Sequence, residues 1–202
     1  MANVKVVQPE AGSGYFKLNF EKAEIKPNFA NISVKNNNKV VAWGAAYWQY
    51  FEKMDKIKAF VETPIKITKE LYREDNTPEG KKLSLITDKN VLKVGDKVKM
   101  RIVLSVDRSM EFVHLKDGRA ATMEPQNTIS SYKYQGGLGY YEETRDAATN
   151  FFFDYLPKGT YVFEYPLTIQ HKGEFSCGIA TLQSMYAPEF TSHTEGVRVK
   201  VE

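Results

Sequence analysis

The chain has 202 residues, of which 42% are hydrophobic, 26% are charged and 13% are aromatic. This composition is typical of a globular protein and excludes a disordered or low-complexity chain. With 28 Lys and Arg residues against 25 Asp and Glu residues, the net charge is only +3, and no run of like charges gives a concentrated basic face. Nucleic acid and the membrane surface are therefore unsupported as partners.

The N-terminal segment MANVKVVQPEAG lacks the basic stretch and apolar core that a secretory signal needs. We therefore expect either an intracellular protein or a piece of a longer exported chain. No stretch reaches the roughly 18 consecutive apolar residues that span a bilayer, so we expect no membrane-spanning segment. The single Cys177 leaves no internal disulfide.

The first sixty residues contain three runs that predict short strands, YFKLNF, NISV and KVVAWGAAYWQYF, with a turn at Asn36, Asn37 and Asn38. In the third run, burial is the expected state of the large rings of Trp43 and Trp48. Three strands are too few to bury two faces. We therefore interpret residues 1–61 as a partial β segment that relies on other structure, with a boundary near FVETPIK.

From residue 62 onward, period-2 alternation dominates. In DKVKMRIVLSV the apolar residues from Val98 to Val106 fall on one face of an extended chain and the lysines fall on the other. Turn residues separate similar runs, which are PIKITKELY from 64, LSLI from 83, EFVHL from 111, NFFFDYL from 150, TYVFEYPLTI from 160, FSCGIATLQSMY from 175 and GVRVKV from 196. Residues 62–202 are thus predicted to form an all-β, immunoglobulin-like antiparallel β-sandwich.

The aromatic segment NFFFDYLPKGTYVFEY is predicted to form a strand, a tight corner and a second strand. Leu-Pro, Gly-Thr and then Tyr161 resemble the corner of immunoglobulin-like sandwiches, where a tyrosine hydroxyl bonds to upstream backbone. The rings on either side of this corner are expected to point into the sandwich.

The sequence contains few residues in catalytic or metal-binding patterns. His114, His171 and His193 are far apart and belong to no ligand cluster, and His193 with Glu195 lacks a third ligand. Cys177 lies in an alternating strand, where a small buried thiol is the ordinary occupant. GGLGYYEE from Gly136 matches no phosphate-binding spacing, so it is interpreted as an excursion between strands. We therefore expect no catalytic residue, no cofactor and no metal; a hydrolase would need His114, His193 and a carboxylate in one cleft.

The loop predicted between residues 118 and 148 is rich in tyrosine, with Tyr132 and Tyr134 ahead of Tyr140 and Tyr141. Exposed rings in this loop would suit a surface carbohydrate-binding module, which is the alternative function that we keep open. Arg145 and Asp146 follow, and we expect them to form surface ion pairs with each other or with Glu142, Glu143 or Asp154.

Two long segments carry a resemblance to a known family. Residues 136–201, which include GGLGYYEETRDAATNFFFDYLPKGTYVFEYPLTI and FSCGIATLQSMYAPEF, resemble the C-terminal end of bacterial alpha-2-macroglobulins, especially the large forms of Bacteroides-like organisms. Residues 40–57, VVAWGAAYWQYFEKMDKI, look like the segment that follows the thioester domain in the same proteins. Together the likeness covers nearly the whole chain.

The resemblance implies a non-catalytic C-terminal fragment of an exported protease trap, periplasmic or on the cell surface. Its partners would be the other domains of the parent chain and, through the full-length protein, proteases. Residues 62–202 would take the receptor-binding-domain position, but the chain shows no receptor-contacting helix near 120–135. No Cys-x-Glu-Gln thioester motif is present, because Gly178 follows Cys177.

In this family the C-terminal domain packs close to the thioester and helps to exclude water. SMYAPEF places Met185 and Tyr186 after a predicted strand. The resemblance therefore implies that Met185 and Tyr186 cover the thioester of the parent protein. Ordinary packing within the sandwich is the alternative for both residues.

Overall fold

The computed structural model describes residues 8–87 and 90–202, and the chain divides into two units, Met1–Gln49 and Tyr50–Glu202. The expectation about a secretory signal concerns in part residues 1–7, which lie outside the described residues. Among the described residues, none of the helices has the length and apolar character needed to cross a membrane.

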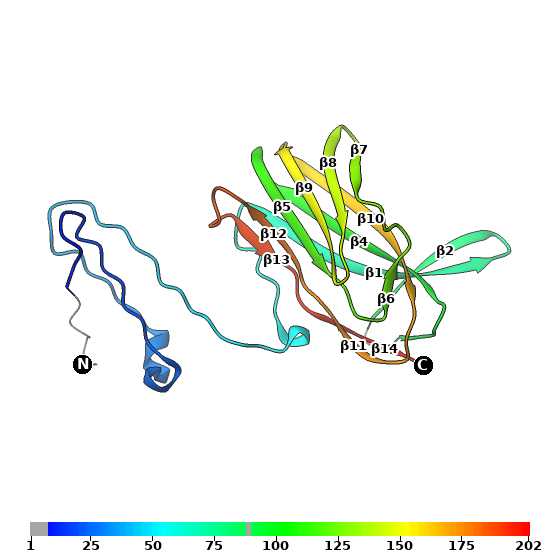
Figure 1. The fold of residues 1–202 in the computed structure, drawn as a ribbon, viewed down its shortest axis with the longest axis horizontal. Coiled ribbons are helices and arrows are strands. Elements are labelled where there is room, and N and C mark those ends of the chain that lie inside the picture. The colour runs from blue at the N-terminus through cyan, green and yellow to red at the C-terminus, as the bar shows by residue number, and fades with distance from the viewer. Residues whose placement is uncertain (1–7, 88–89) are drawn as a thin grey trace. The chain divides into compact units, whose positions relative to one another are not determined.

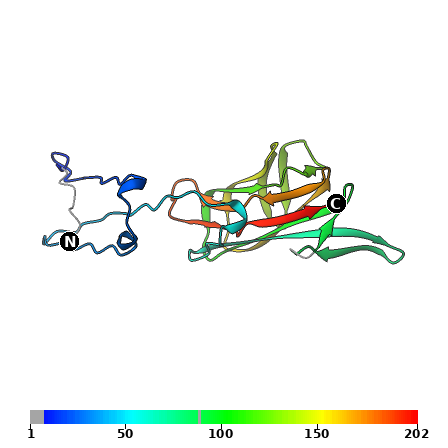
Figure 2. The same ribbon diagram turned by 90° about the horizontal axis from the view of Figure 1, so that it is seen from below.

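The second unit is an all-β structure (Figures 1 and 2). The first of its sheets has the order β2-β1-β4-β10-β6 and consists of β1 (Ile65–Thr77), β2 (Gly80–Leu85), β4 (Lys97–Val106), β6 (Met123–Pro125) and β10 (Gly159–Ile169). The second has the order β13-β12-β5-β9-β8-β7 and consists of β5 (Met110–Gly118), β7 (Ser131–Gln135), β8 (Leu138–Thr144), β9 (Ala148–Leu156), β12 (Ala180–Ser184) and β13 (Thr191–His193). A small sheet, β11-β14-β3, contains β3 (Val91–Leu92), β11 (Gly173–Cys177) and β14 (Val197–Val201).

Neighbouring strands in the two larger sheets are antiparallel, which confirms the predicted fold class. In the small sheet, β14 and β3 are parallel. The β1–β2 hairpin projects beyond the rest of the sandwich, because β4 pairs with β1 only as far as Arg73 (Figure 1).

The core lies between the inner faces of the two large sheets. On β4, the alternate residues from Val98 to Val106 are buried, as the sequence predicts. The rings of Phe151 and Phe153 on β9 face Phe163 on β10, with centroids 5.3 and 5.6 Å apart. All three rings are no more than 3% exposed. The aromatic segment therefore forms much of the packed core between the two sheets. Full burial of one such ring stabilises the fold by about 1.5–3 kcal/mol.

The predicted corner is also present. The Tyr161 hydroxyl donates a hydrogen bond to the Pro157 carbonyl oxygen at 3.0 Å, which confirms its expected tie to upstream backbone. Gly159 lies under the ring, where an added Cβ would come within 3.3 Å of the hydroxyl oxygen. The corner thus joins β9 in one sheet to β10 in the other.

Two strand predictions need correction. FSCGIATLQSMY is two strands and not one, because the chain changes sheet at Gly178: β11 pairs with β14, whereas β12 pairs with β5. The predicted loop between residues 118 and 148 contains the β7–β8 hairpin. Its turn is formed by Gly136 and Gly137, whose φ angles of 59° and 84° favour glycine and suit a two-residue hairpin turn.

The three strands predicted before residue 52 are wrong for this structure. The described part of the first unit, residues 8–49, has two short 3-10 helices, η1 (Lys22–Glu24) and η2 (Pro27–Ala30), and no strand. Trp43 and Trp48 were expected to be buried but are 88% and 58% exposed. An isolated extended segment has no ladder of hydrogen bonds to hold it, so alternation alone does not make a strand. The predicted turn after Asn36 is present, because the Asn36 side-chain oxygen accepts a hydrogen bond from the Asn38 backbone amide at 2.9 Å.

The start of the second unit packs on its C-terminal strands. A third 3-10 helix, η3 (Met54–Lys56), is followed by a β-bridge between Phe60 and His193. The Gly196 amide donates to the Ile57 carbonyl at 3.0 Å. An added Cβ at Gly196 would lie 1.6 Å from the Met54 carbonyl oxygen, so only glycine fits there.

Candidate functional site

An exposed apolar group lies where the β12–β13 loop meets β5. It consists of Phe112, Met185 and Tyr186, which we call the apolar tip; their exposed fractions are 43%, 60% and 80%. The rings of Phe112 and Tyr186 meet edge to face, with centroids 5.1 Å apart and planes at 82°. Such a pair adds about 0.5–1.5 kcal/mol beyond buried area, so the two rings stabilise each other's position at the surface.

The backbone beneath the tip is anchored to the sandwich. The Met185 amide donates to the Phe112 carbonyl at 2.9 Å, and the Ser184 amide donates to the Phe190 carbonyl at 3.0 Å. The Phe190 amide closes a turn by donating to the Ala187 carbonyl at 2.9 Å. Backbone hydrogen bonds to the sandwich therefore anchor the loop that carries the exposed side chains.

Phe112 is a residue that the sequence interpretation missed. It is the one non-glycine residue with a positive φ angle, 51°, in the part of the chain that the structure describes. A bulky residue in this conformation is strained, and such strain concentrates at functional positions. A signal was present in EFVHL, since adjacent Phe112 and Val113 cannot both point inward from one strand.

Met185 and Tyr186, which the resemblance singled out, are therefore brought together with a third apolar residue. Their exposure differs from what ordinary packing within the sandwich would give.

The tyrosines expected to form a sugar-binding loop divide between the two faces of the β7–β8 hairpin. Tyr140 is 5% exposed and packs edge to face on Phe163 at 5.2 Å, so its expected place at the surface is wrong. The reason is strand alternation, which turns Tyr140 inward and Tyr141 outward. Tyr141 lies beside Tyr132, with ring centroids 5.0 Å apart. Carbohydrate binding stays a prediction, and it now concerns only the outward-facing rings, such as those of Tyr132 and Tyr141.

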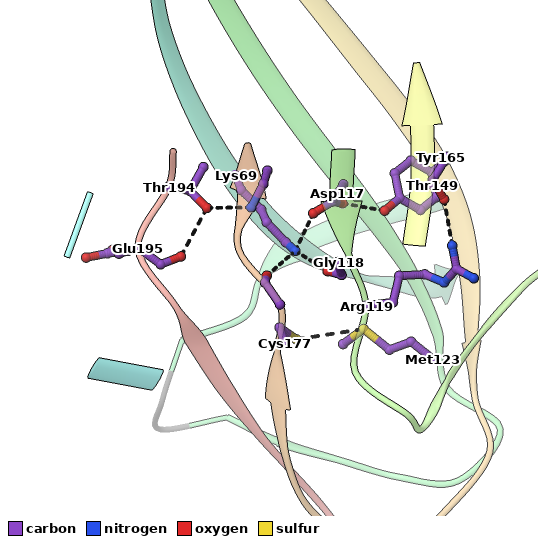
Figure 3. A network of polar contacts seen from close by, with 12 residues as sticks. Lys69, Asp117, Gly118, Arg119, Met123, Thr149, Tyr165, Cys177, Thr194 and Glu195 are labelled. Carbon is purple, nitrogen blue, oxygen red and sulfur yellow. Dashed lines mark hydrogen bonds and ion pairs between the residues drawn. The ribbon is translucent and has the colours of Figure 1, made fainter. Parts of the chain in front are cut away.

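A buried polar network joins the two large sheets (Figure 3). The Lys69 ammonium on β1 lies 2.5 Å from Asp117 Oδ1 on β5 and donates to the carbonyl oxygens of Gly118 and Gly178 at 2.7 and 2.8 Å. The other oxygen of Asp117 accepts from the Tyr165 hydroxyl on β10. The side chains of Lys69 and Asp117 are 3% and 0% exposed.

The two glycines explain how both carbonyls reach one ammonium. Added Cβ atoms at Gly118 and Gly178 would each lie less than 3.0 Å from the other glycine's Cα, so the two backbones touch. The sequence does not reveal this network, because its members are separated by up to 109 residues.

The network continues through Arg119, which donates to Thr149 Oγ1 at 2.7 Å and to the Asp146 carbonyl at 3.1 Å. The backbone carbonyl oxygen of Arg145 also accepts a hydrogen bond from the Arg119 guanidinium. The Arg145 side chain pairs with Glu143, one of the partners expected from the sequence. Because this ion pair lies at the surface, water screens it and it adds little to the stability of the fold.

Burial sets the ionisation of the network. Loss of hydration raises the pKa of the Asp117 carboxyl, and Lys69 acts in the opposite direction. Burial, reinforced by the Asp117 charge, raises the pKa of Tyr165 well above its usual value. The Tyr165 hydroxyl is therefore a proton donor throughout the physiological pH range.

The histidines lie in separate environments. His114 on β5 stacks on Phe152 at 4.6 Å and lies 3.2 Å from Asn150 Oδ1 through its Nε2. His193 on β13 stacks on Phe60 at 5.9 Å. Within residues 8–87 and 90–202, no three His, Cys, Asp or Glu side chains are grouped as metal ligands.

We expect Cys177 to resist alkylation in the folded protein. Its thiol is 1% exposed, and burial raises its pKa to about 11, so the reactive thiolate is scarce at pH 8. Incubation with a thiol reagent, followed by mass measurement, should give no adduct in buffer and one adduct in denaturant. Rapid labelling of the native protein, at the rate seen in denaturant, would contradict this.

The sheets, the tyrosine corner and the buried network define the class of protein, an immunoglobulin-like β-sandwich module. The pattern of the Bacterial Alpha-2-macroglobulin MG10 domain matches residues 65–189, more than half of the chain. The chain belongs to this family, as the sequence resemblance implied. Alpha-2-macroglobulin is a non-enzymatic protease inhibitor that acts as a protease trap.

Solved structures agree on the fold. The chain is similar to Escherichia coli alpha-2-macroglobulin activated by porcine elastase, with 17% identity, a TM-score of 0.56 and coverage of 72% of this chain and 14% of that one. It is also similar to Salmonella alpha-2-macroglobulin reacted with methylamine, with 15% identity, a TM-score of 0.55 and coverage of 72% and 10%. At these identities the likeness concerns the fold alone.

Among curated proteins, the chain is 24% identical over 210 residues to the Circularly permutated Ras protein 2 of Dictyostelium discoideum, which covers 96% of this chain and 5% of that protein. The chain thus spans a small fraction of each relative's length. A Bacteroides-type origin stays a prediction, since these relatives come from other organisms.

Proposed function

We propose that this chain is a non-catalytic domain of an exported protease trap and that its apolar tip docks on the thioester region of the parent protein. The family assignment supports the trap as the parent. The observation that carries the docking proposal is Tyr186, which is 80% exposed although its loop is anchored to the sandwich. An exposed cluster of large apolar side chains is typical of an interaction surface.

Shielding a thioester requires that water be kept from a reactive acyl group, and a tip of one Met and two aromatic rings suits that task. Phe112 holds the Tyr186 ring from the side, and Met185 widens the apolar cover. By closing over the thioester, the domain would also stabilise the trap before a protease cleaves its bait. Exposure to proteases agrees with a periplasmic or cell-surface location, typical of the family.

We propose a complementary role for residues 1–61, as a partial β segment that follows the thioester domain and pairs with strands elsewhere in the parent chain. Trp43, Tyr47 and Phe51 support this, since their rings are between 84% and 107% exposed in the chain alone. Removing these rings from water would favour association, at about 25 cal/mol for each Å² of apolar surface buried.

The test of the shielding role uses the full-length parent protein. Tyr186→Ala should accelerate release of the thioester thiol by methylamine about tenfold, which corresponds to a loss of about 1.4 kcal/mol of protection. Thiol release is followed with a chromogenic reagent. The matched control is Tyr132→Ala, which removes a similarly exposed ring, 77%, from another part of the surface. Equal rates for wild type and Tyr186→Ala would refute the shielding role, and equal acceleration in both variants would assign the effect to general instability.

A further inference from the structure

The buried pair Lys69 and Asp117 brings an amine into direct contact with a carboxyl group. The amine nitrogen lies 2.5 Å from one carboxyl oxygen, and both side chains are sealed between the sheets. The carbonyls of Gly118 and Gly178 hold the nitrogen in place from the other side. Two functional groups fixed in this way have a very high effective concentration, since no translational freedom is left to lose.

The dry surroundings also change the balance between acid plus amine and amide. In water, condensation is opposed because the separate groups gain hydration as carboxylate and ammonium ions. Inside the sandwich that gain is lost, because burial of each charge costs several kcal/mol. Burial raises the pKa of the Asp117 carboxyl, which favours the neutral acid that the reaction requires.

We propose that Lys69 and Asp117 join in an intramolecular amide, formed between Lys69 Nζ and the Asp117 side-chain carbonyl carbon. A proton passes from the Lys69 ammonium to Asp117 Oδ1, which gives a neutral amine beside a neutral acid. The amine lone pair then attacks the carbonyl carbon. The carbon–Oδ1 bond breaks, and Oδ1 leaves with its proton and one more proton from the amine as a single water molecule.

Tyr165 has a defined part in this step. Its hydroxyl donates to Asp117 Oδ2, the oxygen on which negative charge develops and which the amide retains. A preorganised donor at such an oxygen stabilises the transition state in the way of an oxyanion hole. The amide N–H that remains has the Gly118 and Gly178 carbonyls as acceptors.

The bond would link β1 of one sheet to β5 of the other, across 48 residues of sequence. A covalent link between the sheets prevents their separation, which is the opening that a protease needs to reach a sandwich core. For a domain of a protein that meets proteases, this would confer resistance without a disulfide.

Intact mass under denaturing conditions tests the proposal on the wild-type chain. We expect a mass lower than that of the sequence by one water molecule, and a tryptic digest containing a branched peptide that joins the segments around Lys69 and Asp117. A wild-type mass equal to that of the sequence would overturn the proposal.

Asp117-Gly118 needs its own control, because an Asp-Gly pair also loses one water when it cyclises to a succinimide. A succinimide stays within one peptide, is opened by mild base and forms equally well in Lys69→Met. The proposed amide survives base, is branched and is absent from Lys69→Met. Water loss that persists in Lys69→Met would therefore overturn the proposal.

Tyr165→Phe tests the assigned role of the hydroxyl. It keeps the ring and removes the donor to Oδ2, so the linked fraction in freshly purified protein should fall below that of wild type. Because mass is measured after denaturation, poor folding of this variant would not hide a bond once formed. An unchanged linked fraction would remove Tyr165 from the mechanism.

Discussion

Lys69→Met is expected to lower the free energy of unfolding by about 3–5 kcal/mol, the cost of leaving a buried charge without its partner. The variant keeps the aliphatic stem of residue 69 but takes away every donor that faces Asp117 from β1. Asp117 has no exposed surface and retains only the Tyr165 hydroxyl as a neutral donor. Urea unfolding followed by fluorescence gives the measurement.

The loss in Lys69→Met should depend on pH. Without the ammonium, burial outweighs the opposing effects of the Tyr165 hydroxyl and the Arg119 charge and holds the folded-state pKa of Asp117 above its unfolded value of about 3.9. The folded state then binds a proton more tightly than the unfolded state, so stability falls as pH rises above 4. The variant should therefore be closer to wild type at pH 5 than at pH 8.

Two further variants isolate the charge effect. Lys66→Met lies on the same strand with an exposed side chain and should change stability by less than about 0.5 kcal/mol. Adding Asp117→Asn to Lys69→Met removes the unpaired charge and should restore part of the loss. A single Lys69→Met variant as stable as wild type would show that the contact between Lys69 and Asp117 does not hold the sheets together.

Phe151→Ala should lower the free energy of unfolding by about 3–5 kcal/mol, because it opens a cavity at the centre of the core. The Phe151 ring is 1% exposed and lies against Tyr140 at 5.9 Å and Phe163 at 5.3 Å. Rings in both sheets would lose contacts, and close-packed neighbours relax only partly into the space. Urea unfolding should show a lower midpoint with an unchanged slope.

The control for Phe151→Ala is Tyr155→Ala on the same strand. Tyr155 is 53% exposed, so removal of its ring should cost far less. Equal losses in the two variants would mean that the aromatic segment does not form the core, and the scaffold interpretation would fail with it.

The apolar tip and the buried network are two distinct features of the domain. The tip is anchored yet exposed, which suits contact with another part of a larger protein. The network lies buried between the sheets and links β1 of one sheet to β5 of the other. The proposed shielding role would need both, since a covering surface protects a reactive group only while the domain that carries it stays folded.

Local sequence patterns were sufficient to predict an antiparallel β-sandwich over residues 62–202, the inward faces of β4, β9 and β10, and the Tyr161 corner. These features follow from local rules: side chains alternate along a strand, and Leu-Pro with Gly-Thr favours a tight turn. The family likeness likewise singled out Met185 and Tyr186 from a short local motif.

The remaining features depend on contacts between parts of the chain that are distant in sequence. Whether an alternating segment becomes a strand depends on a partner strand. The KVVAWGAAYWQYF run has no such partner among the described residues, whereas the Tyr132 to Tyr141 segment pairs with itself as a hairpin. Lys69, Asp117 and Gly178 meet only because strands from two sheets cross where two glycines let the backbones touch. Burial then turns an ordinary lysine and aspartate into a coupled pair, because the loss of hydration is a property of the folded surroundings and not of either residue.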